Sequence, residues 1–382
     1  MNVAETISAT RSGVGLFEMA HRGLLEVRGE DRVRWLDGMI SGDVEALEKA
    51  GSGSGCYATL LTNRGAIVAD FHVGHLEDAY YLESLRTEIP RIRESLGRYI
   101  IADDVELTDR SDETVTLGLE GPGSANLLAK VAGGEAAGLD EDAWIRVSIA
   151  GRAVLIAAFG FSGECAFQLR MRAEDRQAIE EALFEGTSGE GLVRGTLEAL
   201  EIMRVEAGIP ALGSELDEEV LPPEARLERA ISTTKGCYVG QEIVARLRAR
   251  GQVNHLLVGL KIEPADASAD LPPVDASLSC QGRVTGELTS VVQSPTEGSI
   301  GLGYVRREHS EIGTDVDVEG GRRATVVALP FVALRQRAPR SGGTDNTQET
   351  QETQETQDTQ STGPATDFHP APNDQAGGSE SS

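Results

Sequence analysis

The chain has 382 residues, which is long enough for two or three domains with hydrophobic cores, and 40% of its residues are hydrophobic. Its 62 acidic and 35 basic residues give a formal net charge of −27, so its surface repels nucleic acid and anionic membranes. No apolar run approaches the roughly 20 residues of a membrane helix, and the N-terminus lacks the basic and apolar regions of a signal peptide. We therefore expect a cytoplasmic protein with no nucleic-acid or membrane partner. The acidity fits either a salt-rich cytoplasm or an acidic, arginine-rich proteome without salt adaptation.

The N-terminal part begins with residues 1–12, whose pattern is typical of a loose leader. A strand-like run follows from Leu24 and ends at Gly29, and Asp31 then caps a predicted helix. The four cysteines, at positions 56, 165, 237 and 280, show no spacing typical of a metal site. A chain of this size does not need disulfides, so we expect reduced thiols and no metal site.

A β-hairpin is predicted over residues 57–73. The apolar runs 57–61 and 66–73 are typical of strands, and residues 62–65 supply Asn and Gly for the turn. Asp70 stands within the second run, where a carboxylate is costly unless it is paired, hydrogen-bonded or part of a site. The pattern alone equally allows a solvent-facing position for Asp70.

The rest of the chain contains helices, short strands and a polar tail. Helices are predicted at residues 88–101 and 198–206, and the second ends at a glycine followed by a proline. Short, turn-bounded strands recur between residues 256 and 329 and predict a small β-barrel. Repeats of Thr-Gln-Glu without apolar residues predict a disordered acidic tail over residues 341–382.

The segment most indicative of function is the octapeptide 235–242, Lys-Gly-Cys-Tyr-Val-Gly-Gln-Glu. Its two glycines favour a presented loop, and Lys235 is close enough in sequence to favour the thiolate of Cys237. Glu242 begins a helix-like run that continues to residue 248. The alternative is a glycine-bounded turn that holds a buried, inert cysteine.

This octapeptide resembles the signature of the YgfZ family of folate-binding proteins, which are relatives of the glycine cleavage T-protein, an aminomethyltransferase. The resemblance covers about residues 13–333. It implies an α+β fold, with a T-protein-like folate-binding body of mixed sheets and helices at residues 13–250. The small β-barrel would then occupy residues 251–335.

The resemblance also implies site residues. Asp70 matches the catalytic aspartate of the T-protein hairpin, although Ala69 replaces the first aspartate of its pair. Gln168 stands where the T-protein has a glutamate that holds the folate pterin, in a segment that includes Glu164. Leu200 replaces a functional arginine of the T-protein.

Within the octapeptide, the resemblance makes Cys237 the reactive thiol. Lys235, Tyr238, Gln241 and Glu242 would tune this thiol or contact a cofactor, which is tetrahydrofolate or a derivative.

Three functions remain open from the sequence. The first is a tetrahydrofolate-binding accessory protein that supports assembly or repair of iron–sulfur proteins through the Cys237 loop. Its partners would be reduced folate and iron–sulfur client proteins or assembly factors. The second is a folate-dependent aminomethyl or methyl transferase of the T-protein type, and the third is a folate scaffold without chemistry.

Overall fold

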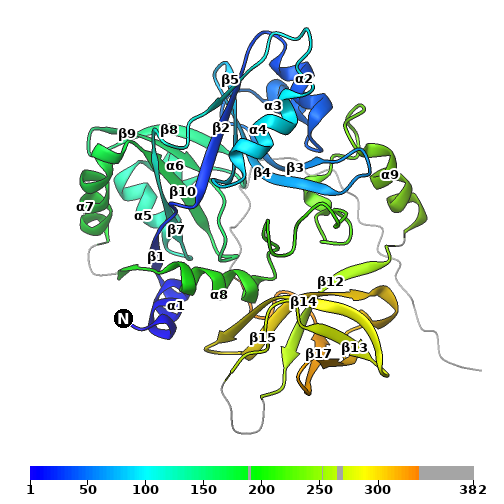
Figure 1. Cartoon of the computed structure of the whole chain (residues 1–382). Coiled ribbons are helices and arrows are strands. Elements are labelled where there is room, and N and C mark those ends of the chain that lie inside the picture. The colour runs from blue at the N-terminus through cyan, green and yellow to red at the C-terminus, as the bar shows by residue number, and fades with distance from the viewer. Residues whose placement is uncertain (188–190, 252, 265–269, 335–382) are drawn as a thin grey trace, which may run out of the picture. The chain divides into compact units, whose positions relative to one another are not determined.

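The computed structural model describes residues 1–187, 191–251, 253–264 and 270–334 (Figure 1). The tail predicted at residues 341–382 lies outside the described residues. Within the described ranges, no helix combines the length and the apolar character needed to cross a bilayer.

The N-terminal segment forms helix α1 (Val3–Ser12), so the prediction of a loose leader was wrong. Asn2 caps the helix, because its side chain accepts a hydrogen bond from the backbone N–H of Glu5 while the Glu5 carboxylate accepts one from Asn2. Arg11 in the last turn pairs with Glu164 at 3.0 Å and with Glu206 at 2.7 Å. These ion pairs connect the helix to two distant parts of the chain.

A six-stranded sheet forms the first layer of the body, in the order β11-β1-β7-β10-β9-β8 (Figure 1). Its strands are β1 (Val14–Glu18), β7 (Val115–Glu120), β8 (Trp144–Ile149), β9 (Arg152–Ala157), β10 (Ala166–Met171) and β11 (Leu192–Arg194). Its accompanying helices are α5 (Ser124–Val131), α6 (Gly134–Ala137), η1 (Ala173–Asp175) and α7 (Arg176–Gly186). Buried leucines of α5 and α7 share one core with apolar residues of β10, so these helices cover one face of the sheet.

A five-stranded antiparallel sheet follows the order β3-β4-β5-β2-β6. Its strands are β2 (Arg22–Arg28), β3 (Gly55–Leu61), β4 (Ile67–Leu76), β5 (Ala79–Leu85) and β6 (Glu106–Asp109), and its helices are α2 (Arg32–Met39), α3 (Val44–Ala50) and α4 (Ile89–Gly97). The predicted hairpin is confirmed as β3 and β4, in which Tyr57 pairs with His72 and Thr59 with Asp70. The predicted helix over residues 88–101 is shorter, because α4 ends at Gly97.

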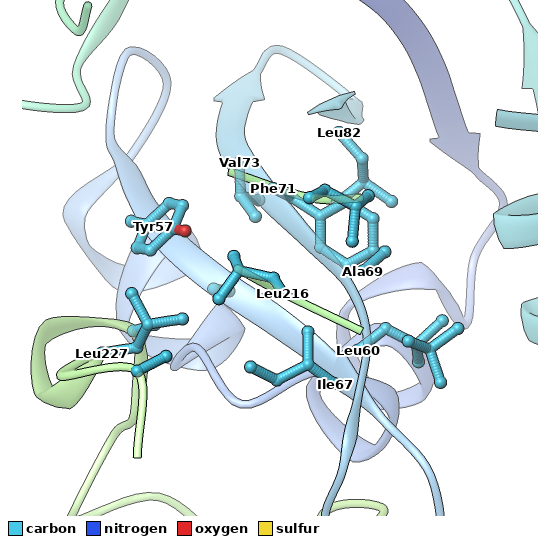
Figure 2. Close-up of a cluster of buried hydrophobic side chains, with 14 of the residues drawn as sticks. Tyr57, Leu60, Ile67, Ala69, Phe71, Val73, Leu82, Leu216 and Leu227 are labelled. Atoms are coloured by element: carbon cyan, nitrogen blue, oxygen red, sulfur yellow. The ribbon is translucent and has the colours of Figure 1, made fainter. Parts of the chain in front are cut away.

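Apolar side chains of this hairpin pack into a buried cluster. Figure 2 shows Ala69, Phe71 and Val73 of β4 beside Leu82, and Leu216 close to the hairpin. These three positions alternate with Asp70 and His72, and successive residues of a strand point to opposite faces of the sheet. The core therefore takes one face of β4 and leaves the two polar side chains on the other.

Helix α8 (Leu197–Ala207) and the C-terminal barrel complete the fold. The barrel closes in the order β12-β15-β14-β13-β16-β17, which confirms the predicted small β-barrel and the α+β class. Its elements are β12 (His255–Ile262), β13 (Ser277–Cys280), β14 (Arg283–Ser294), β15 (Gly298–Arg306), η3 (Arg307–His309), β16 (Asp315–Val318) and β17 (Arg322–Val327). The predicted domain limits at residues 250 and 335 stay predictions.

A buried polar network connects α8 to the barrel. The Arg204 guanidinium pairs with Glu215 at 2.9 Å and donates to the Ser290 hydroxyl of β14 at 2.8 Å. Thr289 and Ser290 in turn donate to Glu215 at 2.8 and 2.6 Å. The side chains of Arg204 and Glu215 are 5% and 0% exposed, and breaking such a buried pair costs about 3 to 5 kcal/mol. The network therefore holds α8 firmly against the barrel.

Candidate functional site

A cavity of about 400 Å³ lies where the five-stranded sheet meets α8 and the segment that follows it. Its volume is within the usual range for small-molecule sites. Strands β3 and β4 contribute Tyr57, Asp70 and His72, and α8 contributes Leu200 and Glu201. Polar side chains thus line the wall formed by the sheet, and the wall formed by α8 combines leucines with the charged Glu201 and Arg204.

Asp70, the carboxylate predicted to be catalytic, lies in the wall of this cavity. The Tyr57 hydroxyl donates a hydrogen bond to Asp70 Oδ2 at 2.9 Å. Burial raises the pKa of Tyr57 well above its usual value, and the nearby Asp70 carboxylate raises it further. The phenol therefore stays protonated and acts as a fixed donor, which leaves Oδ1 of Asp70 for a ligand.

Arginines and aromatic rings surround the carboxylate. The Arg229 guanidinium lies 4.6 Å from the centre of the Tyr57 ring, and that of Arg22 lies 4.8 Å from the centre of the Phe161 ring. Arg22 is buried and pairs with Glu83 at 2.9 Å. Arg229 also has a carboxylate partner, because it pairs with Glu141 at 2.6 Å. The rings of Tyr57 and Phe161 line the cavity, and aromatic rings suit a planar heterocycle.

His72 lies two residues after Asp70 and also lines the cavity. Its Nδ1 is 2.7 Å from Asp142 Oδ1, and its ring stacks on Phe159 with 3.6 Å between centroids. The prediction from sequence missed this residue. The two-residue spacing from Asp70 was the available signal for a shared face, and nothing in the sequence connects position 72 with Asp142.

Gln168, predicted to bind folate, is buried on β10 and does not line the cavity. Its amide nitrogen donates to the Phe159 carbonyl at 3.2 Å and lies 3.5 Å from Glu120 Oε1. Glu120 also accepts hydrogen bonds from the backbone N–H groups of Phe161 and Ser162. Gln168 therefore supports the segment that carries Phe161 into the cavity, and its folate contact stays a prediction.

Glu120, which lies beside Gln168, has an unusual pKa. Burial raises the pKa of Glu120 to about 7, against the opposing effect of its hydrogen bond from Ser162.

Glu164, also predicted to bind folate, is paired with Arg11 at 3.0 Å. Glu164 lines a second hollow of about 330 Å³, on the side of Gly160 that also holds Cys165. Glu164 therefore does not line the Asp70 cavity, and its folate contact stays a prediction.

The side chain of Lys235 is buried, and its ammonium group is bound within the protein. Nζ donates to the carbonyl oxygens of Asp37, Ile40 and Gly42 at 2.5, 3.0 and 2.6 Å, and it pairs with Asp37 Oδ1 at 3.0 Å. The side chain is 1% exposed. These contacts make Lys235 an anchor that holds the loop to the end of α2.

Cys237 is an exposed, free thiol, in contrast to the alternative of a buried cysteine. Its neighbour Tyr238 is buried, and the N–H of Val239 donates to the carbonyl oxygen of Gly38 at 3.1 Å. Gly240 has a φ of 81°, and a Cβ there would lie 2.6 Å from the Thr62 carbonyl oxygen. The loop is thus fixed against α2 and the hairpin while its sulfur faces outward.

The helix predicted after this loop is confirmed as α9 (Gln241–Arg250). Gln241 donates to the Gly236 carbonyl at 3.2 Å, and Glu242 pairs with Arg246 at 2.7 Å. None of the predicted site residues of the octapeptide lines the Asp70 cavity. These five residues are Lys235, Cys237, Tyr238, Gln241 and Glu242. The predicted site therefore divides into a cavity and a separate exposed loop.

Comparison with known proteins identifies the family. Residues 1–235 match the GCVT N-terminal domain, and residues 256–333 match the glycine cleavage T-protein C-terminal barrel domain. The chain is 30% identical to the aminomethyltransferase of Halalkalibacterium halodurans, across 86% of this chain and 90% of that protein. It is 31% identical to the aminomethyltransferase of Symbiobacterium thermophilum, across 86% and 89%.

A solved structure agrees in fold. The glycine cleavage system aminomethyltransferase T from Bartonella henselae superposes with a TM-score of 0.74 at 23% identity, over 87% of this chain and 90% of that one. The two domain matches together cover the body and the barrel described above. The chain therefore belongs to the glycine cleavage T-protein family.

Proposed function

We propose that the cavity binds a reduced folate and that the protein uses it to transfer an aminomethyl or methyl group. The observation that carries this proposal is the Asp70 carboxylate, held by Tyr57 at 2.9 Å in the wall of a cavity of about 400 Å³. The proteins named aminomethyltransferase that resemble this chain over most of its length support the same chemistry.

The wall of the cavity fits such a ligand. The edges of Tyr57 and Phe161 suit a flat ring system, and Oδ1 of Asp70 can accept from a ring or amine N–H. Arg22 and Arg229 lie beside these same two rings and provide positive charge next to a bound ring system. A reduced folate supplies a nitrogen that carries the one-carbon unit, and Asp70 would stabilise positive charge on that nitrogen.

A second function is supported by the Cys237 loop. We propose as the alternative an accessory protein of the YgfZ type, which binds a reduced folate and supports assembly or repair of iron–sulfur proteins in the cytoplasm. The specific observation is that Cys237 is exposed, while the side chain of Lys235 and the neighbouring Tyr238 are buried. Leu200 lines the cavity with an apolar side chain where the T-protein resemblance implies an arginine, which also favours altered chemistry.

The transferase is tested by supplying glycine, a lipoyl carrier protein and tetrahydrofolate, with methylenetetrahydrofolate as the measured product. We expect the wild-type protein to form it and Asp70→Asn to lose most of this activity. Glu242→Gln is the matched control, because Glu242 is an exposed carboxylate outside the cavity. Absence of product with the wild-type protein, under conditions where a relative is active, would reject the transferase.

The accessory function is tested in a strain depleted of this protein. Cys237→Ser should fail to restore the activity of iron–sulfur enzymes, while Cys280→Ser on the barrel should restore it. Equal rescue by both variants would exclude a role for the thiol. Mass spectrometry of gently purified protein then reports whether a folate accompanies it, and a folate without either activity would favour the scaffold.

A further inference from the structure

The wall of the cavity carries a histidine on the same strand as Asp70. His72 belongs to the same strand and the same face, because residues two apart on a strand point the same way. Its Nδ1 lies 2.7 Å from Asp142 Oδ1, where the carboxylate accepts the Nδ1–H. This hydrogen bond selects the tautomer in which Nε2 carries the lone pair, and His72 lines the cavity.

We propose that the His72–Asp142 pair is a proton acceptor and donor for the ligand in the Asp70 cavity, with Nε2 of His72 as the atom that exchanges the proton. This inference rests on the proposed folate-dependent transfer. Asp142 is a positioning residue, which orients the imidazole and compensates its charge when Nε2 is protonated. His72 is the residue that would contact the ligand.

The surroundings of Asp142 keep it ionised. Although burial raises the pKa of Asp142, the hydrogen bond with His72 and the charges of His72 and Arg229 outweigh it and hold the pKa below its usual value. Arg229 lies 3.6 Å from Asp142 Oδ2. A carboxylate that remains charged can stabilise an imidazolium beside it.

The ring of His72 is held rigidly. One face stacks on Phe159, with the planes only 2° apart, and the Tyr57 ring lies 5.0 Å away. On the neighbouring strand, Glu83 pairs in register with His72, but its carboxylate is bound by Arg22 at 2.9 Å. The charged and titratable groups around the ring are therefore Asp142, Arg229, Tyr57, Asp70, Glu83 and Arg22.

The proton step is balanced without any further reagent. An ammonium or ring N–H of the ligand loses its proton to Nε2, and the electron pair of that N–H bond stays on the ligand nitrogen. The imidazole becomes an imidazolium, whose charge the Asp142 carboxylate compensates. The reverse step returns the proton to the ligand or its product. General acid–base help of this kind is worth about 10²–10⁴-fold in rate.

The two other histidines near these strands do not have this arrangement. His21 also lines the cavity, but its Nδ1 is buried without a hydrogen-bond partner in the described structure, and burial lowers its pKa. His75 lies on the other face of β4, stacks on Tyr80 and does not line the cavity. His75 therefore offers a matched control within the same strand.

The experiment compares the full-length wild type with His72→Asn, Asp142→Asn and the control His75→Asn. An asparagine at position 72 keeps an N–H near the place of Nδ1 for Asp142 and removes Nε2. We expect tetrahydrofolate to bind about 10-fold more weakly to His72→Asn, as for one lost ligand hydrogen bond, and kcat to fall about 10²-fold or more. His75→Asn should match the wild type in both.

The pH dependence separates proton transfer from a structural role. In Asp142→Asn the imidazolium loses its partner, so the acid limb of the kcat/KM profile should move to lower pH. A profile that stays in place overturns the role of Asp142, and unchanged affinity and kcat in His72→Asn overturn the role of His72. If the wild type itself fails to bind tetrahydrofolate, the proposed function and this inference fail together.

A measurement on the wild type covers the case in which a variant does not fold, as checked by circular dichroism. With ¹⁵N-labelled imidazoles, NMR should show Nδ1–H and an unprotonated Nε2 for His72 at alkaline pH, and tetrahydrofolate should shift the Nε2 resonance. If tetrahydrofolate binds and the Nε2 resonance does not shift, the contact between His72 and the ligand is rejected.

Discussion

Replacing Lys235 with methionine should lower the free energy of unfolding of the protein, and not only change the surroundings of Cys237. Methionine fills much of the same space but removes three hydrogen bonds to the carbonyls of Asp37, Ile40 and Gly42, together with the ion pair to Asp37. Each hydrogen bond to a charged group contributes about 1.5 to 3 kcal/mol, and burial of the ammonium, which lowers the pKa of Lys235, offsets part of that sum. The expected loss is about 3 to 5 kcal/mol in the free energy of unfolding.

The assay is urea unfolding of the full-length protein, followed by tryptophan fluorescence and far-ultraviolet circular dichroism. Lys49→Met is the matched control, because Lys49 is exposed and makes one surface pair with Glu45, which is worth below about 1 kcal/mol. A loss below about 1 kcal/mol in Lys235→Met would refute the reasoning. It would mean that the cost of burying the ammonium offsets its hydrogen bonds and its ion pair.

Three other substitutions test separate parts of the site. Asp70→Asn should lower methylenetetrahydrofolate formation by about 10²-fold or more without changing the unfolding midpoint, because its charge serves the ligand. Cys237→Ser should leave tetrahydrofolate affinity within about 2-fold of the wild type, as measured by calorimetry, because the exposed thiol is outside the cavity wall. Burial raises the pKa of Glu120 to about 7 from 4.5, so its contribution to stability is present at low pH and is lost as the pH rises through 7. Glu120→Gln removes this titration, so its stability relative to that of the wild type should rise by about 2 to 3 kcal/mol from pH 5 to pH 8, and parallel stability curves would contradict this.

Local patterns predicted the larger elements of this fold. The β3–β4 hairpin, the barrel strands and the glycine stop at the end of α8 follow from alternation and turn chemistry, which act over a few residues. Helix α1 was missed, although Asn2 and Glu5 have the spacing of a capping box. That helix buries few apolar residues, so hydrophobic periodicity gave no sign of it.

The site was harder to predict, because side-chain direction depends on distant partners. Lys235 is two residues from Cys237, yet its flexible stem carries the ammonium to carbonyls almost 200 positions away in the chain. Gln168 was placed by resemblance at a pterin, whereas its amide faces Phe159 and Glu120. The His72–Asp142 contact joins segments 70 residues apart, and no local rule predicts such a pair.

The Arg204–Glu215 pair affects any attempt to exchange the barrel of this protein for that of a relative. Arg204 belongs to the helix that walls the cavity, while Ser290, which bonds to both charges, belongs to the barrel. A grafted barrel without a hydroxyl at position 290 would remove one hydrogen-bond partner from each of the buried charges of Arg204 and Glu215. It would thereby weaken the packing of α8, which forms part of the cavity wall. The design of a chimera should therefore keep Arg204, Glu215 and a hydroxyl at position 290 before any surface residue is adjusted.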